Sequence, residues 1–250
     1  MSAEETRDLV VEVPRTYKTQ INDALMFALV KAICSWTGGN SALIELEGHG
    51  REAILDGIDA SRTVGWFTTL YPVWLQLPAA GEMRGQIQSI HAALQRIPHH
   101  GMGFGILRYL SENRETSAAM ERLPRAEISF LYMGQFDQAF SSDSLFAPAL
   151  ESVGSAHDPD GERCHLLEIN SLIRQGRLQM SWTYSRNRHR QQTIRSLARE
   201  YMNELRALIA SCRDTDAGDD VQSRFKGSGI SESDLAEIRR QVAIQAKGAM

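Results

Sequence analysis

Composition and charge narrow the class of protein before any motif is considered. The chain has 250 residues, of which 42% are hydrophobic and 23% are charged; these values are typical of a soluble globular protein with a sizeable core. The formal net charge is −4 and the pI is near 6.0. No cluster of basic residues is visible, which argues against a nucleic-acid-binding surface.

The cysteines and the N-terminal residues indicate the cellular location of the protein. Cys34, Cys164 and Cys212 are far apart and show no CxxC or Cys/His metal spacing. We therefore expect a reducing, cytoplasmic location, no structural zinc, and thiols that act as packing residues. The N-terminal residues are acidic, and the most apolar helix contains Lys31. Neither a signal peptide nor a membrane-spanning segment is expected.

Hydrophobic periodicity predicts the elements of the first 100 residues. They are helices at 3–13, 19–36 and 82–97 and strands at 42–47 and 64–70. Ser2 and Glu5 form a capping box for the first helix, which is predicted to end before Pro14. Glu45 and Glu47 fall on one face of their strand because side chains alternate. The apolar run of the second strand indicates a sheet covered on both faces.

The second half of the chain is predicted to be rich in strands. After a helical stretch to about residue 122 come strands at 126–132, 165–174 and 177–184 and a helix at 191–212. Gln175 and Gly176 are predicted to form a hairpin turn. An acidic linker at 214–229 precedes a separate amphipathic helix within 230–250. Helices mixed with paired and singly inserted strands predict an α/β sandwich.

Two short motifs carry the chemical signal. Residues 47–52 read EGHGRE, and residues 62–68 read RTVGWFT, followed by Tyr71 and Pro72. In the first motif two glycines bracket His49, and carboxylates lie at both ends. Charged groups therefore gather where the backbone can turn sharply and approach a ligand. The first motif predicts an acid/base site.

These motifs resemble, in sequence and order, those of the epimerisation domains of nonribosomal peptide synthetases, which are relatives of condensation domains. Residues 98–105, PHHGMGFG, resemble the family segment PxxGxGYG, and residues 130–137, FLYMGQFD, resemble FNYLGQFD. The resemblance implies an α/β, chloramphenicol-acetyltransferase-like mixed-sheet sandwich, in which residues 1–213 form the C-terminal one of the usual two lobes. The family motif HHxxxDG belongs to the other lobe. His99 and His100 precede a glycine-rich run without an aspartate, so we interpret them as loop residues.

The resemblance also assigns roles to individual residues of the active site. It implies that Glu47 is catalytic, across a tunnel from the histidine of the missing lobe. It implies that the Tyr132 hydroxyl could hydrogen bond to a thioester oxygen as negative charge develops; the alternative is a buried core tyrosine. Leu131 replaces the family's asparagine and removes a polar side chain from the tunnel wall. Glu45 is expected to face solvent, the alternative being that it tunes the pKa of Glu47.

Four further residues are expected to order the site or to line the tunnel. His49 is expected to order the glycine turn by hydrogen bonding. Arg51 is expected to pair with Glu52 or with the aspartate of the missing lobe. Arg62 and Trp66 belong to the second motif, and Trp66 is expected to pack the lobe instead of touching substrate.

The implied reaction is inversion of the α-carbon of an aminoacyl or peptidyl thioester, which needs a base on one face of the carbon and a proton donor on the other. Substrate would arrive on the phosphopantetheine arm of a peptidyl carrier protein, with no cofactor or metal bound directly. The other expected partners are the missing N-terminal lobe, without which the chain should be inactive, and a downstream synthetase docked by 230–250. The alternatives are a non-catalytic docking module and a condensation-type lobe.

Overall fold

The computed structural model describes residues 1–52, 57, 59–78, 81–137, 149, 151, 154, 158 and 161–225, with side chains described as far as residue 213. The chain divides into two compact units, Met1–Ile209 and Ala210–Met250. All the described strands belong to the first unit. The docking helix predicted within 230–250 lies outside the described residues, and its role stays a prediction.

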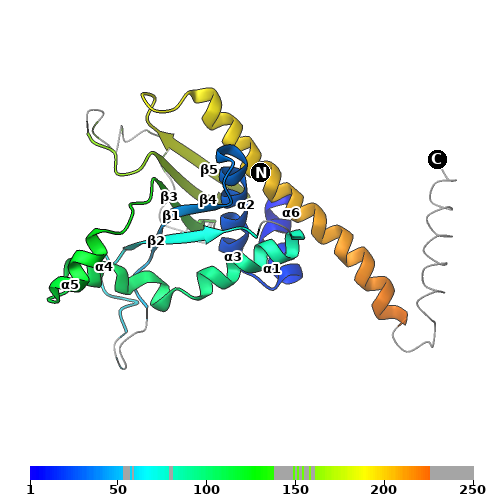
Figure 1. The fold of residues 1–250 in the computed structure, drawn as a ribbon. Coiled ribbons are helices and arrows are strands. Elements are labelled where there is room, and N and C mark those ends of the chain that lie inside the picture. Colours follow the sequence, from blue (N-terminus) through cyan, green and yellow to red (C-terminus); the bar gives the residue numbers. More distant parts are fainter. Residues whose placement is uncertain are drawn as a thin grey trace. The chain divides into compact units, whose positions relative to one another are not determined.

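A single five-stranded mixed sheet organises the first unit (Figure 1). Its strands are β1 (Ser41–Gly48), β2 (Thr69–Gln76), β3 (Ile128–Gln135), β4 (Leu167–Arg174) and β5 (Arg177–Tyr184), in the spatial order β2-β1-β3-β4-β5. The three central strands are parallel, and the two edge strands pair antiparallel to their neighbours. The hairpin turn between β4 and β5 is confirmed, since Gln175 and Gly176 have φ of 53° and 66°, as a two-residue turn of this hand requires.

The helices are α1 (Ala3–Tyr17), α2 (Ile21–Thr37), α3 (Met83–Gln95), a 3-10 turn η1 (Pro98–Gly101), α4 (Met102–Tyr109), α5 (Arg114–Glu121) and α6 (Gln191–Phe225). Helix α2 contacts α1, α3 and β1, while α1 contacts β5 and α3 contacts β2, so these three helices form a layer beside the sheet (Figure 1). Every side chain from Ala24 to Val30 is buried. Helix α2 is therefore enclosed on all sides, and not only along the stripe that its sequence suggests.

Only one face of the sheet is covered by this helix layer. Side chains alternate in burial along the strands, and the buried members include Ala42, Ile44, Phe130, Leu167, Ile169 and Ile173. Their neighbours in sequence point the other way and remain half-exposed or exposed. We call this second side the open face. The mixed-sheet α/β architecture expected from the sequence is confirmed.

Two helices differ from their predicted bounds. Helix α1 continues through Pro14 to Tyr17, because Val13 and Tyr17 are buried and the Pro14 carbonyl accepts hydrogen bonds from the N–H groups of Lys18 and Thr19. Packing outweighs the helix-breaking effect of proline in the last turns. Helix α6 runs to Phe225, beyond the end predicted at 212 and into the predicted linker. A single glycine in that stretch costs only about 1 kcal/mol, which is too little to end a helix by itself.

The prediction of a strand at 64–70, covered on both faces, is wrong. The strand begins at Thr69, and the residues before it form a loop in which Val64 and Trp66 are 100% and 87% exposed. Trp66 was expected to pack the lobe, and its exposure shows that it does not. Among the cysteines, Cys34 and Cys212 are buried as expected, but Cys164 is exposed and is not a packing residue.

Candidate functional site

Glu47 lies at the end of β1, one residue before the strand stops. The register of β1 with β2 is regular from Ser41 to Gly48, so strand alternation places Glu47 on the open face with Leu43 and Glu45. The sheet thus presents two half-buried carboxylates to the same side.

Glu45 was expected to face solvent, but its side chain does not. Its carboxylate lies 2.9 Å from the imidazole Nε2 of His165, in the segment that leads into β4. Both side chains are mostly buried. An ion pair with a protonated histidine, or a hydrogen bond with a neutral one, therefore satisfies Glu45 inside the protein.

The turn after Glu47 is held by its own polar groups. The backbone N–H of Arg51 donates to Nδ1 of His49 at 3.0 Å, and Nε2 of the same imidazole lies 3.1 Å from the Glu52 carboxylate. Gly50 has a φ of 65°, and a Cβ at this position would overlap the Phe67 carbonyl oxygen. Only glycine lets the turn approach the second motif so closely. His49 contacts both sides of the turn that it is expected to order.

Arg51 joins the two motifs. Its guanidinium donates to the carbonyl oxygens of Ala60 and Gly65 at 2.5 and 3.3 Å, and it lies 4.3 Å from the centre of the Phe67 ring. The expected pairing of Arg51 with Glu52 is not seen, because this loop occupies the guanidinium. Glu52 contacts histidines instead.

His100 is the second histidine near Glu52. Its Nε2 lies 3.9 Å from the Glu52 carboxylate, a contact that the sequence did not predict. His99 and His100 have left-handed backbones, with φ of 46° and 49°, in agreement with their interpretation as loop residues. The glycine that follows them was the available signal that this loop bends back toward the EGHGRE turn.

Glu47 and Tyr132 line the same small cavity. The cavity has a volume of about 120 Å³, and its lining also includes Tyr71, His100 and Ile97. Tyr132 is paired in register with the fully buried Ser171, which places its side chain on the helix-covered face. Glu47 reaches this cavity from the end of β1, so the two residues expected to act together border one cavity.

Burial governs the ionisation of the tyrosines at this cavity. It raises the pKa of Tyr132 above its ordinary value of 10.0. It also raises the pKa of Tyr71, with a smaller contribution from the negative charge of Glu52. Both phenols therefore stay protonated near neutral pH and can act as hydrogen-bond donors. Arg62 is exposed, and neither Arg62 nor Trp66 lines this cavity.

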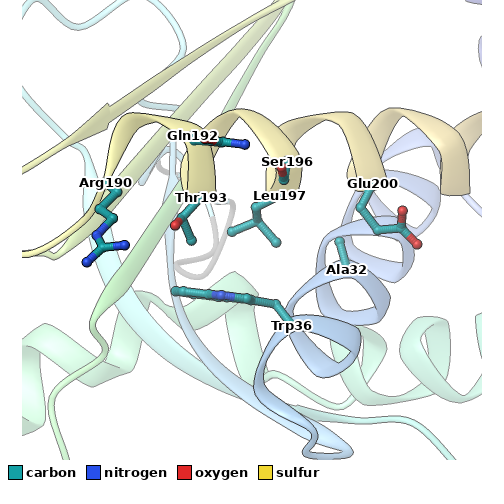
Figure 2. A pocket seen from close by; sticks show the side chains of 8 residues that line it. All are labelled: Ala32, Trp36, Arg190, Gln192, Thr193, Ser196, Leu197 and Glu200. Carbon is teal, nitrogen blue, oxygen red and sulfur yellow. The ribbon is translucent and has the colours of Figure 1, made fainter.

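A second cavity, of about 530 Å³, lies between α2 and the first turns of α6. Figure 2 shows the Trp36 ring beneath α6, with Arg190 at one end and Glu200 at the other. Trp36 also packs edge-on against His189, with ring centres 5.9 Å apart. This cavity shares no lining residue with the Glu47 cavity. Sequence reasoning missed it because its walls are far apart in the chain.

Comparison with known proteins agrees with this architecture. The family model described as "Condensation domain" matches residues 2–226. The chain belongs to the condensation-domain family. It is 44% identical over 225 residues to a linear gramicidin synthase of Brevibacillus parabrevis, covering 90% of this chain and 3% of that protein. It is 37% identical to bacitracin synthase 3 of Bacillus licheniformis, covering 96% of this chain and 4% of that protein. The chain thus spans a small part of these synthetases.

Solved members of the condensation-domain family show the same fold. The epimerization domain from the third module of tyrocidine synthetase B matches with a TM-score of 0.76 and 37% identity, covering 85% of this chain and 47% of that one. A condensation domain of the enacyloxin polyketide synthase matches with a TM-score of 0.58 and 13% identity, covering 83% of this chain and 39% of that one. At that identity the likeness concerns the fold alone.

The described residues also bear on membranes and metals. Within them, no helix has the length and apolar character needed to cross a membrane. In the same part of the chain, no group of three or more histidine, cysteine, aspartate or glutamate side chains is arranged to hold a metal ion.

Proposed function

We propose that this chain supplies the Glu47 side of an epimerisation site, at which the α-carbon of a carrier-protein-bound aminoacyl or peptidyl thioester is inverted. The substrate would be held on the phosphopantetheine arm of a peptidyl carrier protein. The second acid/base group would come from a lobe carrying HHxxxDG, as the sequence resemblance implies. The cytoplasm is the proposed location, supported by three cysteines that form no disulfide with one another.

The observation that carries this proposal is the likeness to an epimerization domain in particular. The match to the tyrocidine synthetase domain has 37% identity, whereas the condensation domains of the enacyloxin and calcium-dependent antibiotic synthases match with 12–14% identity. The EGHGRE turn, which separates the two classes by sequence, is also held by contacts among its own polar groups.

Epimerisation by this lobe requires one carboxylate that a substrate on the open face can reach. Removal of the α-proton transfers it to a base and leaves the electron pair delocalised onto the thioester oxygen as an enolate. Return of a proton to the opposite face of the carbon restores the thioester with inverted configuration. Glu47 is half-buried on the open face near the end of β1, whose pairing with β2 holds it in place. The proposal makes it one of the two groups that exchange the proton.

A deuterium-exchange experiment tests the proposal. The whole chain is fused to the half of the tyrocidine synthetase epimerization domain that it does not match, and the fusion is incubated with an L-aminoacyl carrier protein in deuterated water. We expect α-deuteron incorporation and D-product from the fusion, and neither from the chain by itself. In the fusion, Glu47→Gln should slow exchange by about a hundredfold to ten-thousandfold, because the amide cannot transfer a proton.

Glu45→Gln is the matched control. It makes the same chemical change two residues away on the same face, at a side chain that His165 already satisfies, and should change the rate less than threefold. A fusion that folds but gives no exchange would contradict the proposal. So would equal, modest losses in both variants, because Glu47 would then be only part of a charged rim.

A further inference from the structure

The open face places one neutral polar side chain in line with Glu47. Leu46 pairs with Phe130 across β1 and β3, and Phe130 pairs with Ile169 across β3 and β4. One residue further along each strand, the side chains turn to the open face. There Leu131 is paired with Asn170 in register, and continuing the β1–β3 register by one residue brings Glu47 to the same row.

The two carboxylates of the neighbouring row on this face are already satisfied within the protein. The carboxylate of Glu45 contacts His165 at 2.9 Å, and that of Glu168 contacts Arg163 at 3.0 Å. By contrast, among the residues that the structure describes, Glu47 and Asn170 have no side-chain hydrogen bond or ion pair. On their own row, they are the two polar side chains of the central strands, and the protein leaves both available to a ligand.

Leu131 lies between these two polar groups. Adjacent strands are about 4.8 Å apart, so the backbones of Glu47 and Asn170 are separated by about 10 Å across β3. Such a gap accommodates a few atoms of a ligand resting on the leucine side chain. Leucine offers no competing hydrogen bond, and its apolar surface strengthens polar interactions on either side.

We propose that the side-chain amide of Asn170 contacts the substrate and donates a hydrogen bond to the thioester carbonyl oxygen. This inference rests on the proposed function. When the α-proton moves to its base, the C–H electron pair shifts onto that oxygen, and the Asn170 N–H stabilises the resulting negative charge. On reprotonation the pair returns to the carbon, so the amide gains and loses no proton. A neutral donor suits this place because it stabilises an oxyanion without drawing the Glu47 carboxylate into an ion pair.

Substitutions at Asn170 in the same fusion test this role. Asn170→Ala should lower kcat for α-deuteron exchange by about a hundredfold, the usual effect of removing one donor to an oxyanion. Asn170→Asp keeps the shape, removes the N–H groups and adds a negative charge, and should lower kcat at least as much. KM should change less than threefold for Asn170→Ala, because the hydrogen bond strengthens only as charge develops.

Ser181 provides the matched control. It is paired in register with Asn170, one strand further from Glu47 on β5, and it is exposed. Ser181→Ala should therefore leave kcat within twofold of the unsubstituted fusion. Asn170→Ala should leave the melting temperature within about 1–2 °C, since a half-exposed amide without a protein partner contributes little to stability.

Three results would overturn the inference, and they differ from failure of the proposed function. Exchange by Asn170→Ala within threefold of the unsubstituted fusion, while Glu47→Gln abolishes exchange, would remove Asn170 from the site and leave the proposed function standing. A fall in melting temperature that accounts for the lost rate would make Asn170 a structural residue. An equal loss in Ser181→Ala would show that the edge of the sheet, and not this amide, is being disturbed. Full activity of Glu47→Gln would instead refute the proposed function itself.

Discussion

Removal of one oxygen atom from the core should make this protein more stable. Tyr201 of α6 is fully buried, its ring lies edge-on to Trp182 with centres 6.0 Å apart, and its hydroxyl has no hydrogen-bond partner among the described residues. A buried hydroxyl that has lost its water without gaining a partner costs about 1–3 kcal/mol. Tyr201→Phe keeps the ring and its packing and removes this cost, so the free energy of unfolding should rise by about that amount.

The expected change is measurable by thermal and urea denaturation. For a chain of this size, each kcal/mol raises Tm by about 2–4 °C. The slope of the urea transition should not change, because the same surface becomes exposed on unfolding. Tyr184→Phe is the control: Tyr184 is half-buried on β5, where water can solvate the hydroxyl, and its removal should alter Tm by less than about 1 °C.

The same hydroxyl predicts a dependence on alkaline pH. Burial raises the pKa of Tyr201 far above its ordinary value of 10.0. The folded protein therefore keeps this proton after the unfolded chain has lost it, and the stability linked to it falls as pH rises above about 10. Tyr201→Phe should lose less stability than the unsubstituted protein between about pH 9 and 11. A lower Tm for Tyr201→Phe at neutral pH would refute the reasoning, since it would mean that the hydroxyl is satisfied in solution.

Two other substitutions test the site turn and the N-terminal helix. Gly50→Ala should destabilise the protein by at least about 1–2 kcal/mol, the cost of a left-handed backbone at a non-glycine residue. Gly85→Ala, in the exposed part of α3 where a Cβ meets nothing, should be neutral or stabilising. Equal Tm values for the two variants would show that the turn is not built as described. A hydrogen bond from Arg206 lowers the pKa of Glu5 from 4.5 to about 2, so the stability linked to this carboxylate is present above pH 4.5 and is lost as pH falls toward 2. Because Glu5 is partly exposed, Glu5→Gln should reduce stability by less than about 1 kcal/mol at neutral pH and by little near the lowered pKa. A full loss that persists at that acidic pH would assign the effect to the capping box instead.

Local signals in the sequence were sufficient for much of the fold. The β4–β5 hairpin was predictable because strand-like runs flank Gln175 and Gly176 on both sides, and glycine accepts the left-handed backbone that a two-residue turn requires. Helices α2 and α3 and strand β1 were predictable from periodicity, and Glu47 was placed at a strand end by the glycines that follow it. These features depend on residues within a few positions of one another, where backbone sterics and side-chain alternation decide the outcome.

Tertiary structure decided the features that depend on partners distant in the chain. Pro14 lies inside α1 because buried neighbours hold the helix together, and the strand predicted at 64–70 begins only at Thr69, where it can pair with β1. The meeting of Tyr132 and Glu47 at one cavity, and the alignment of Glu47 with Asn170, follow from the register of three strands. Register between distant strands arises from the packing of whole faces, and a shift of one residue would exchange those faces. A motif can therefore name the residues of a site, but the sheet determines which of them face the same ligand.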